Sequence, residues 1–216
     1  MTRRAPPRRI CLAVVLALTP LLILAGCGGL LPSPQHRDIY RVSPAVNFTA
    51  PLPRITAQLV VAAPTAPGDL DTKRIALSRA SGSIDYFDAS EWSDRATFVV
   101  QDALVAAFRQ SGSFPAVGPD NADLRADWLL NITVRDFEAA YDSPDKAPKA
   151  VVRLDAQLLH MPDRRVVAQQ SFGHAAPAMA NAIPDIAHAF DAALGGSVQD
   201  IVTWVATQGN RLKRMR

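Results

Sequence analysis

The chain has 216 residues, of which 49% are hydrophobic, and its formal net charge is +3. This length suits one domain with additional segments, or two small domains. Four of the positive charges are arginines within the first 26 residues, which contain no acidic residue, and the remainder holds 19 Lys and Arg against 20 Asp and Glu. The basic balance therefore comes from the N-terminus and does not indicate binding to nucleic acid.

Residues 1–26 have the pattern of a secretory signal peptide. Met1–Arg9 is basic, Ile10–Leu24 is a mostly apolar run, and small residues precede Cys27. The apolar run of about 15 residues is shorter than the roughly 20 that a membrane-spanning helix needs. Leu24-Ala25-Gly26-Cys27 resembles the bacterial lipobox, which implies cleavage between Gly26 and Cys27 and acylation of Cys27 by a fatty acid such as palmitate. The alternative is an ordinary signal peptide with an incidental cysteine.

The cysteines and the next residue refine this prediction. Cys11 lies inside the signal peptide and Cys27 at its end, so the mature chain has no pair for a disulfide. Gly28, the second mature residue, is not the aspartate that commonly retains lipoproteins in the inner membrane. We therefore expect a lipid-anchored protein of the cell envelope that faces the periplasm, at the outer membrane rather than the inner one.

Composition divides the rest of the chain into three parts. Residues 27–54 are rich in proline and read as a tether, in which Ile39–Val42 could pair as an edge strand. Residues 55–208 contain the periodic apolar patterns of a folded domain, and residues 209–216 form a basic tail.

The first half of the domain centres on a long helix, predicted from about Glu91 to Gln110. Its apolar stripe includes residues 96, 99, 100, 103, 104, 107 and 108. Asp88 or Ser90 would cap it, and Gly112 would end it in a left-handed conformation. Short strands are predicted before it at Gln58–Ala62, Ile75–Arg79 and Ile84–Phe87, and after it at Phe114–Val117. The last two should run parallel, joined by a right-handed crossover.

The second half predicts three long strands and another helix. Residues 128–135 and 151–159 alternate between apolar and polar, as strands with one buried face do. A turn at Met161–Arg164 predicts that Val166–Phe172 returns as an antiparallel hairpin. A final helix is predicted over Pro184–Thr207, with Gly195-Gly196 as a kink or a close-packing point. The fold class is therefore α/β, a single domain with a mixed sheet of about six strands and two long amphipathic helices packed on it.

The order of these segments resembles that of the ABC-type transport auxiliary lipoproteins, the PqiC-like and MCE-associated group. The resemblance lies in Tyr40-Arg41-Val42, the loop Asp69-Leu70-Asp71, Ser83–Phe87, Trp92 before the helix, and Phe114–Val117. It covers most of residues 24–205. It implies an auxiliary component of an MCE-type ABC transport system that moves lipids between membranes. The partners it implies are an MCE-domain protein and the permease and ATPase of that system, and it allows ring-like association of copies of the chain.

No motif in the sequence indicates catalysis. The four histidines (His36, His160, His174 and His188) do not pair at metal-ligand spacing, and there is no phosphate-binding glycine-rich loop or nucleophile elbow. We expect no catalytic residue, no metal and no cofactor. A catalytic pair formed only in three dimensions would leave no such motif, so a lipid-anchored hydrolase or solute-binding protein stays an alternative, which a deep polar pocket would favour.

Three aromatic residues are candidates for a partner surface: Tyr86, Phe87 and Trp92. Aromatic side chains are enriched at the centres of protein interfaces, but they also build cores, and both interpretations suit this segment. If no transporter is the partner, the leading alternative is an envelope scaffold or assembly lipoprotein.

Overall fold

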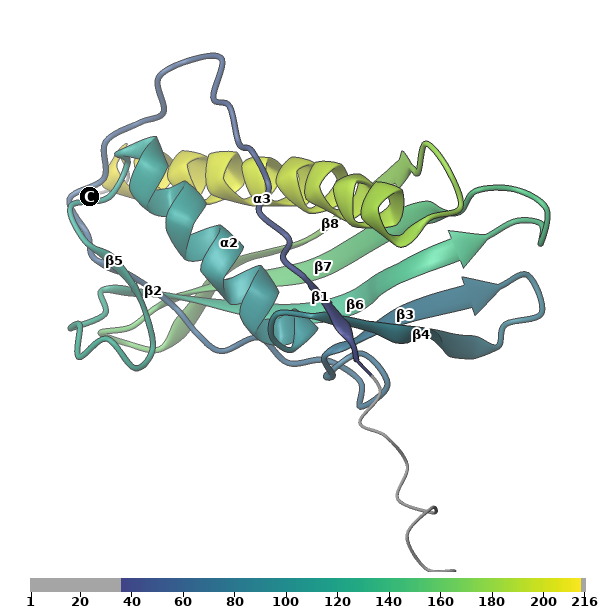
Figure 1. Ribbon diagram of the computed structural model, residues 1–216. Helices are drawn as coiled ribbons and strands as arrows, with labels where there is room; N and C mark the ends of the chain where they lie inside the picture. Colours follow the sequence, from purple (N-terminus) through teal and green to yellow (C-terminus); the bar gives the residue numbers. More distant parts are fainter. Residues whose placement is uncertain (1–35, 215–216) are drawn as a thin grey trace, which may run out of the picture. The chain divides into compact units, whose positions relative to one another are not determined.

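The computed structural model describes residues 36–214, and from Arg37 onward they form one compact unit (Figure 1). The described chain contains eight strands in one sheet and two helices, confirming a mixed sheet covered by two helices. In chain order the elements are β1 (Asp38–Tyr40), β2 (Leu59–Val61), β3 (Arg74–Arg79), β4 (Ile84–Trp92), α2 (Ala96–Ser111), β5 (Val117–Pro119), β6 (Trp128–Tyr141), β7 (Lys149–His160), β8 (Arg165–Pro177) and α3 (Ile183–Arg214).

Strand β6 organises the sheet because it is long enough to pair with three others. One edge pairs antiparallel with β7 over nearly its whole length. The other edge is shared: β2 pairs in parallel with Trp128–Leu130, and β3 pairs in parallel with Glu138–Tyr141. The predicted hairpin is confirmed, since β8 returns antiparallel along β7.

Both helices lie on one face of this sheet (Figure 1), and the alternation along the strands explains why. Every second residue of β6 and β7 is buried beneath the helices, from Leu130 to Val134 and from Val152 to Leu158. The residues between them point to the opposite face, which no helix of the described chain covers. We call this second surface the open face.

Helix α2 begins later than predicted. Glu91 and Trp92 belong to strand β4, which continues through a register irregularity where Ala89 takes a φ of 53°. Asp88 and Ser90 therefore do not cap the helix: its first turn follows Arg95, whose side chain makes no capping hydrogen bond. The predicted end is confirmed, because Gly112 has a φ of 62° and its N–H donates to the Arg109 carbonyl.

The predicted parallel crossover around α2 is wrong. β4 lies next to β3 on one branch of the sheet, whereas β5 pairs with β2 at the other end of β6. Because β4 is antiparallel to β3, and β3, β6, β2 and β5 are parallel to one another in turn, β4 and β5 run in opposite directions. The helix thus crosses the sheet diagonally (Figure 1).

Helix α3 is continuous through the two glycines in its middle and extends to Arg214. A Cβ on Gly196 would lie 2.5 Å from Nδ1 of His174 on β8, and one on Gly195 would lie 3.1 Å from the carbonyl oxygen of Ala45. The glycines are therefore a close-packing point and not a kink.

Residues 37–54, which the composition assigned to the tether, belong to the compact unit. Strand β1 pairs in parallel with the end of β4, so the predicted edge strand lies at Asp38–Tyr40. Val42 and Val46 are buried, and Gln110 of α2 donates a hydrogen bond to the Val46 carbonyl at 3.0 Å. The segment that leads away from the N-terminus is thus packed along α2.

Candidate functional site

The predicted lipidation and cleavage residues, Cys27 and Gly26, lie outside the described residues, and so does the signal peptide. Acylation of Cys27 therefore stays a prediction. No helix in the described part of the chain is both long and apolar enough to span a membrane.

Trp92 is a core residue. Its side chain is 1% exposed, and its ring lies 4.9 Å from the ring of Phe190 on α3 and 5.8 Å from that of Phe137 on β6. The three aromatic side chains join the sheet to α3. Trp92 therefore packs in the core between the sheet and α3, and its ring is not exposed to a partner.

Tyr86 and Phe87 are half-buried and lie on opposite faces of β4. The Tyr86 hydroxyl donates to the carbonyl oxygen of Asp69 at 3.1 Å, and the guanidinium carbon of Arg74 lies 3.6 Å from the centre of the tyrosine ring. Such a cation–π contact stabilises by about 0.5–1 kcal/mol at exposed sites. The Phe87 ring instead faces Tyr141, 6.5 Å away. The two rings are therefore held in place, and they do not form one aromatic patch.

The loop Asp69-Leu70-Asp71 holds the start of α2. Leu70 is buried, and Asp71 accepts a hydrogen bond from the Thr97 hydroxyl at 2.9 Å and an ion-pair contact from Arg95 at 3.4 Å. The backbone N–H of Ala96 in the first turn donates instead to the carbonyl oxygen of Thr72, the next residue of this segment, at 3.2 Å. The two acids of the loop thus have structural partners, and the loop links Tyr86 to the first turn of α2.

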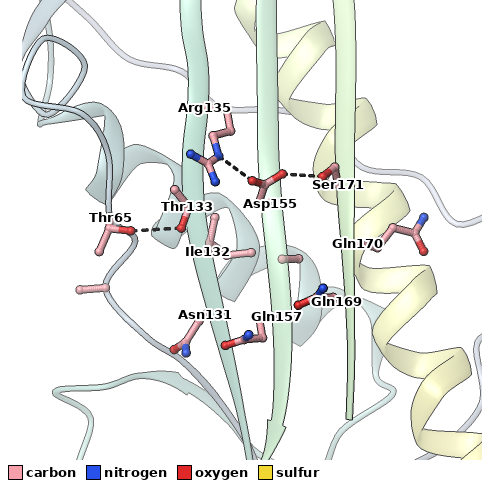
Figure 2. Close-up of a pocket in the computed structure, with 12 residues that line it drawn as sticks. Thr65, Asn131, Ile132, Thr133, Arg135, Asp155, Gln157, Gln169, Gln170 and Ser171 are labelled. Atoms are coloured by element: carbon pink, nitrogen blue, oxygen red, sulfur yellow. Dashed lines mark hydrogen bonds and ion pairs between the residues drawn. The ribbon is translucent and has the colours of Figure 1, made fainter. Parts of the chain in front are cut away.

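A polar concavity lies on the open face, and Figure 2 shows its lining. This open-face groove has a volume of about 760 Å³. It runs across β6, β7 and β8 and is bounded beyond β6 by Thr65. Most of its side chains are neutral amides and hydroxyls: Thr65, Asn131, Thr133, Gln157, Gln169, Gln170 and Ser171.

A charged network crosses the groove in one row. Asp155 of β7 accepts hydrogen bonds from the Arg135 guanidinium and the Ser171 hydroxyl, each at 2.5 Å (Figure 2). These two donors, the serine first, hold the pKa of the Asp155 carboxyl below its usual range. Thr65 and Thr133 share a hydrogen bond of 3.2 Å beside the network. The side chains of this row are therefore fixed by one another.

The groove shows no sign of hydrolytic chemistry. Ser171 donates to a carboxylate, and the nearest histidine along the strand, His174, hydrogen-bonds Asp200 of α3 at 2.8 Å. Serine, histidine and acid therefore do not form a relay of the kind that activates a nucleophile. Among the described residues no group of three His, Cys, Asp or Glu could hold a metal ion. The groove is suited to hydrogen bonding with a polar partner.

The sequence contained a signal for this groove that was not interpreted as a site. Asn131, Thr133 and Arg135 alternate with the buried residues of β6, as Asp155 and Gln157 do in β7. Alternation predicts the polar face of each strand, but only the pairing register places the faces of three strands side by side.

Fold and sequence together identify the class of protein. An α/β unit with two helices on one face of a mixed sheet also occurs in the crystal structure of the Xanthomonas campestris protein XCC0632, of the DUF330 family. The two chains are 32% identical with a TM-score of 0.76, and the match covers 82% of this chain and 99% of that one. A structure of an uncharacterized protein shares the fold at 14% identity and a TM-score of 0.59, covering 80% of this chain and 98% of that one.

The family follows from a match that covers most of the folded unit. Residues 40–202 match the family described as ABC-type transport auxiliary lipoprotein component, and the chain belongs to this family. No curated protein sequence matches the chain. A family of lipoproteins that serve ABC transport places the chain in the cell envelope.

Proposed function

We propose that the protein is the lipid-anchored, periplasm-facing auxiliary component of an MCE-type ABC transport system that moves phospholipid between the inner and outer membranes. The observation that carries the proposal is the family match, which extends from β1 into α3. In this role the protein performs no chemistry. The lipid anchor keeps the folded unit at one membrane, where the unit binds the MCE-domain protein or the permease.

The open face is the surface that we propose for this contact. The helices occupy the other face. Tyr86 lies on the open face, because Ala76 pairs with both Tyr86 and Glu138 and these residues share one row across β4, β3 and β6. Arg135 of the groove lies three residues before Glu138 in β6. Arg74, stacked on Tyr86, adds a charged rim. A rigid aromatic residue beside polar hydrogen-bonding groups is a common composition of a protein interface.

The test is crosslinking of the full chain in its native envelope, followed by purification and identification of the proteins recovered with it. Recovery of an MCE-domain protein or its permease supports the proposal. The change of Tyr86→Ala should then reduce recovery several-fold, whereas Phe98→Ala, on the exposed side of α2, should not. If neither protein is recovered while the controls work, the transport role fails and the scaffold alternative leads.

Anchoring is tested separately by metabolic labelling with palmitate. The parent chain should incorporate label and a Cys27→Ala variant should not, because that cysteine is the predicted acylation site. Label retained by the variant would contradict the predicted site.

The choice of membrane rests on the residue after the cysteine. We propose the outer membrane because Gly28 is not an aspartate. Density separation of the two membranes should place the parent chain in the outer fraction and a Gly28→Asp variant in the inner one. A parent chain found in the inner fraction would reverse this assignment and leave the transport role intact. Self-association of the chain, which the resemblance allows, stays a prediction.

A further inference from the structure

Several elements of the folded unit meet at one of its ends. Gly209, near the end of α3, lies against Ile55 and Trp128: a Cβ there would lie 2.7 Å from Ile55 and 3.3 Å from Trp128. The N–H of Ile55 donates to the carbonyl oxygen of Ser113, just after α2, and Trp128 at the start of β6 pairs with His160 at the end of β7. We call this end, where α3 finishes and β5 lies (Figure 1), the C-terminal end of the unit.

Arginine side chains gather at the C-terminal end. Six exposed arginines lie in the segments that meet there: Arg54, Arg109, Arg125, Arg164, Arg165 and Arg211. The sequence after Arg211 adds three basic residues and no acidic one: Lys213, Arg214 and Arg216. Four aspartates belong to the same segments: Asp120, Asp123, Asp127 and Asp163. Positive charge is therefore in excess at this end.

The rest of the chain has the opposite balance. The chain after residue 26 contains 19 Lys and Arg against 20 Asp and Glu. Nine of these basic residues and four of the acidic ones belong to the C-terminal end, which leaves 10 basic against 16 acidic residues elsewhere. A nearly neutral protein is thus divided into a positive end and a negative remainder. Such a division orients a protein in the field of a charged surface.

Most of the described arginines at this end are not neutralised by a neighbour. Arg165 approaches Asp163 at 3.4 Å, and at the opposite end of β6 Lys149 pairs with Asp142 at 2.7 Å. Four arginines of the C-terminal end form no ion pair within the part of the chain that the structure describes: Arg54, Arg125, Arg164 and Arg211. An unpaired guanidinium can form two parallel hydrogen bonds with a phosphate outside the chain.

An exposed apolar side chain lies among these charges. Val166, the second residue of β8, is 45% exposed and directly follows Arg164 and Arg165. Surfaces that rest on a membrane combine basic side chains, which contact the headgroups, with apolar side chains, which enter the layer beneath them. The combination of charge and apolar exposure at this turn therefore suits a membrane surface.

We infer that the C-terminal end binds the anionic headgroups of a phospholipid membrane, and that this membrane is the one that holds the lipid anchor. Charge complementarity carries the inference, because arginine recognises phosphate and the negative remainder of the chain is repelled by the same surface. The six arginines come from five separate segments, so they present a broad surface, as binding to a membrane requires.

The short connection to the anchor supports this choice of membrane. Ten residues separate Cys27 from Arg37, where the compact unit begins, and a chain of this length spans at most about 36 Å. Contact of an anchored unit with its own membrane is intramolecular, so its effective concentration is high and weak contacts suffice. The choice of membrane rests on the acylation of Cys27. The inference is otherwise independent of the transport role.

The contact has a consequence for the sheet. β6 begins at the C-terminal end and runs away from it, with β7 and β8 beside it. The open face would therefore stand above the membrane surface, where another protein can reach it.

Energy transfer to a labelled lipid tests the contact with the full lipidated chain in vesicles. Thr207→Cys, in the last turns of α3, carries a donor dye, and the vesicles contain a lipid-linked acceptor. Cys11 is lost with the predicted signal peptide and Cys27 is acylated, so the added thiol is the one that reacts. Transfer should be stronger on an equal mixture of phosphatidylglycerol and phosphatidylcholine than on phosphatidylcholine alone. Ala147→Cys, in the loop at the opposite end of β6, should show no such increase.

Salt and two matched variants identify the cause of the increase. In about 1 M salt the screening length is about 3 Å, so the increase should disappear. The triple variant Arg54→Gln, Arg125→Gln and Arg211→Gln should also remove most of it, because three basic residues near an anionic surface strengthen binding by about 100-fold. A triple variant of equal charge change at the opposite end, Arg79→Gln, Lys146→Gln and Lys149→Gln, should leave the increase intact. Thermal melting verifies that both variants fold.

Three results would each overturn the inference. The first is equal transfer from residue 207 on the two vesicle compositions, and the second is an increase that persists in high salt. The third is an equal loss in both triple variants, which would show that net charge alone is responsible. Because the vesicles contain no other protein, an increase that meets all three conditions reports contact with lipid, whether or not a transport partner is recovered from the envelope.

Discussion

The two faces of the sheet are built by the same strands but differ in what constrains their side chains. In β7, Leu154 and Ala156 are buried beneath the helices, while Asp155 and Gln157 between them line the open-face groove. On the covered face each side chain must fit its neighbours in shape and volume. On the open face a side chain is constrained only where another polar group holds it, as Arg135 and Ser171 hold Asp155. Stability should therefore depend mainly on the covered face.

The largest expected effect lies in the aromatic cluster of the covered face. Phe190 is fully buried and its ring lies 4.8 Å from that of Phe137. Phe190→Ala should lower the free energy of unfolding by about 3–5 kcal/mol, because it removes buried apolar surface and leaves a cavity. Phe98→Ala on α2, where the side chain is 41% exposed, is the matched control and should change it by well under half as much. Urea denaturation of the purified chain measures both, and equal losses would contradict the comparison.

A smaller effect is expected where α3 meets β8. Gly196→Ala would place a Cβ within 3 Å of three ring atoms of His174, so the histidine must leave and give up its bond to Asp200. We expect a net loss of roughly 1 kcal/mol, since clashes of this kind cost about 1–3 kcal/mol and alanine regains about 1 kcal/mol of helix propensity.

A second background tests whether His174 causes this loss of stability. In a His174→Ala background the obstacle is gone, and Gly196→Ala should stabilise by about 1 kcal/mol through helix propensity alone. Thermal melting of the four chains of this double-mutant cycle gives the coupling. A loss of stability that persists without the histidine would show that another neighbour, and not His174, requires the glycine.

On the open face the expected effect depends on pH. The pKa of Asp155 is held below its usual range by Ser171 and Arg135, so its contribution to stability is complete above the unfolded value of about 4 and is lost as the pH falls through the folded value. Asp155→Asn should destabilise at neutral pH by up to about 1 kcal/mol, as for exposed ion pairs. The difference from the parent should shrink below pH 4, and a constant difference from pH 7 to pH 3 would contradict this account.

The smallest effect is expected from the amides of the groove. Gln157→Ala should change the free energy of unfolding by no more than about 0.5 kcal/mol, because the side chain is partly exposed and surface substitutions without partners rarely exceed this value. Urea denaturation measures it. A loss comparable with that of Phe190→Ala would show that the open face also carries the fold.

Local patterns of the sequence predicted most of the elements but not where strand gives way to helix. The apolar stripe of α2, the alternation of β6 and β7, and Gly112 as the helix end were all confirmed. The start of α2 was wrong because Asp88 and Glu91 have the spacing of a helix cap while Trp92 is needed as a strand residue in the core. Partners distant in sequence, Phe137 and Phe190, decided that competition, and no local pattern contains them.

By itself the sequence determined the class of this protein: a predicted lipobox, a mixed sheet with two amphipathic helices, and an order of segments that the family match confirms. These properties depend on residue types and short spacings, which are present before folding. Tertiary structure alone decided that β2 and β3 share one edge of β6, that the polar faces of three strands meet in a groove, and that the edge of β8 stays unpaired. Strand order and register arise from contacts between residues far apart in the chain, so only the folded chain determines them.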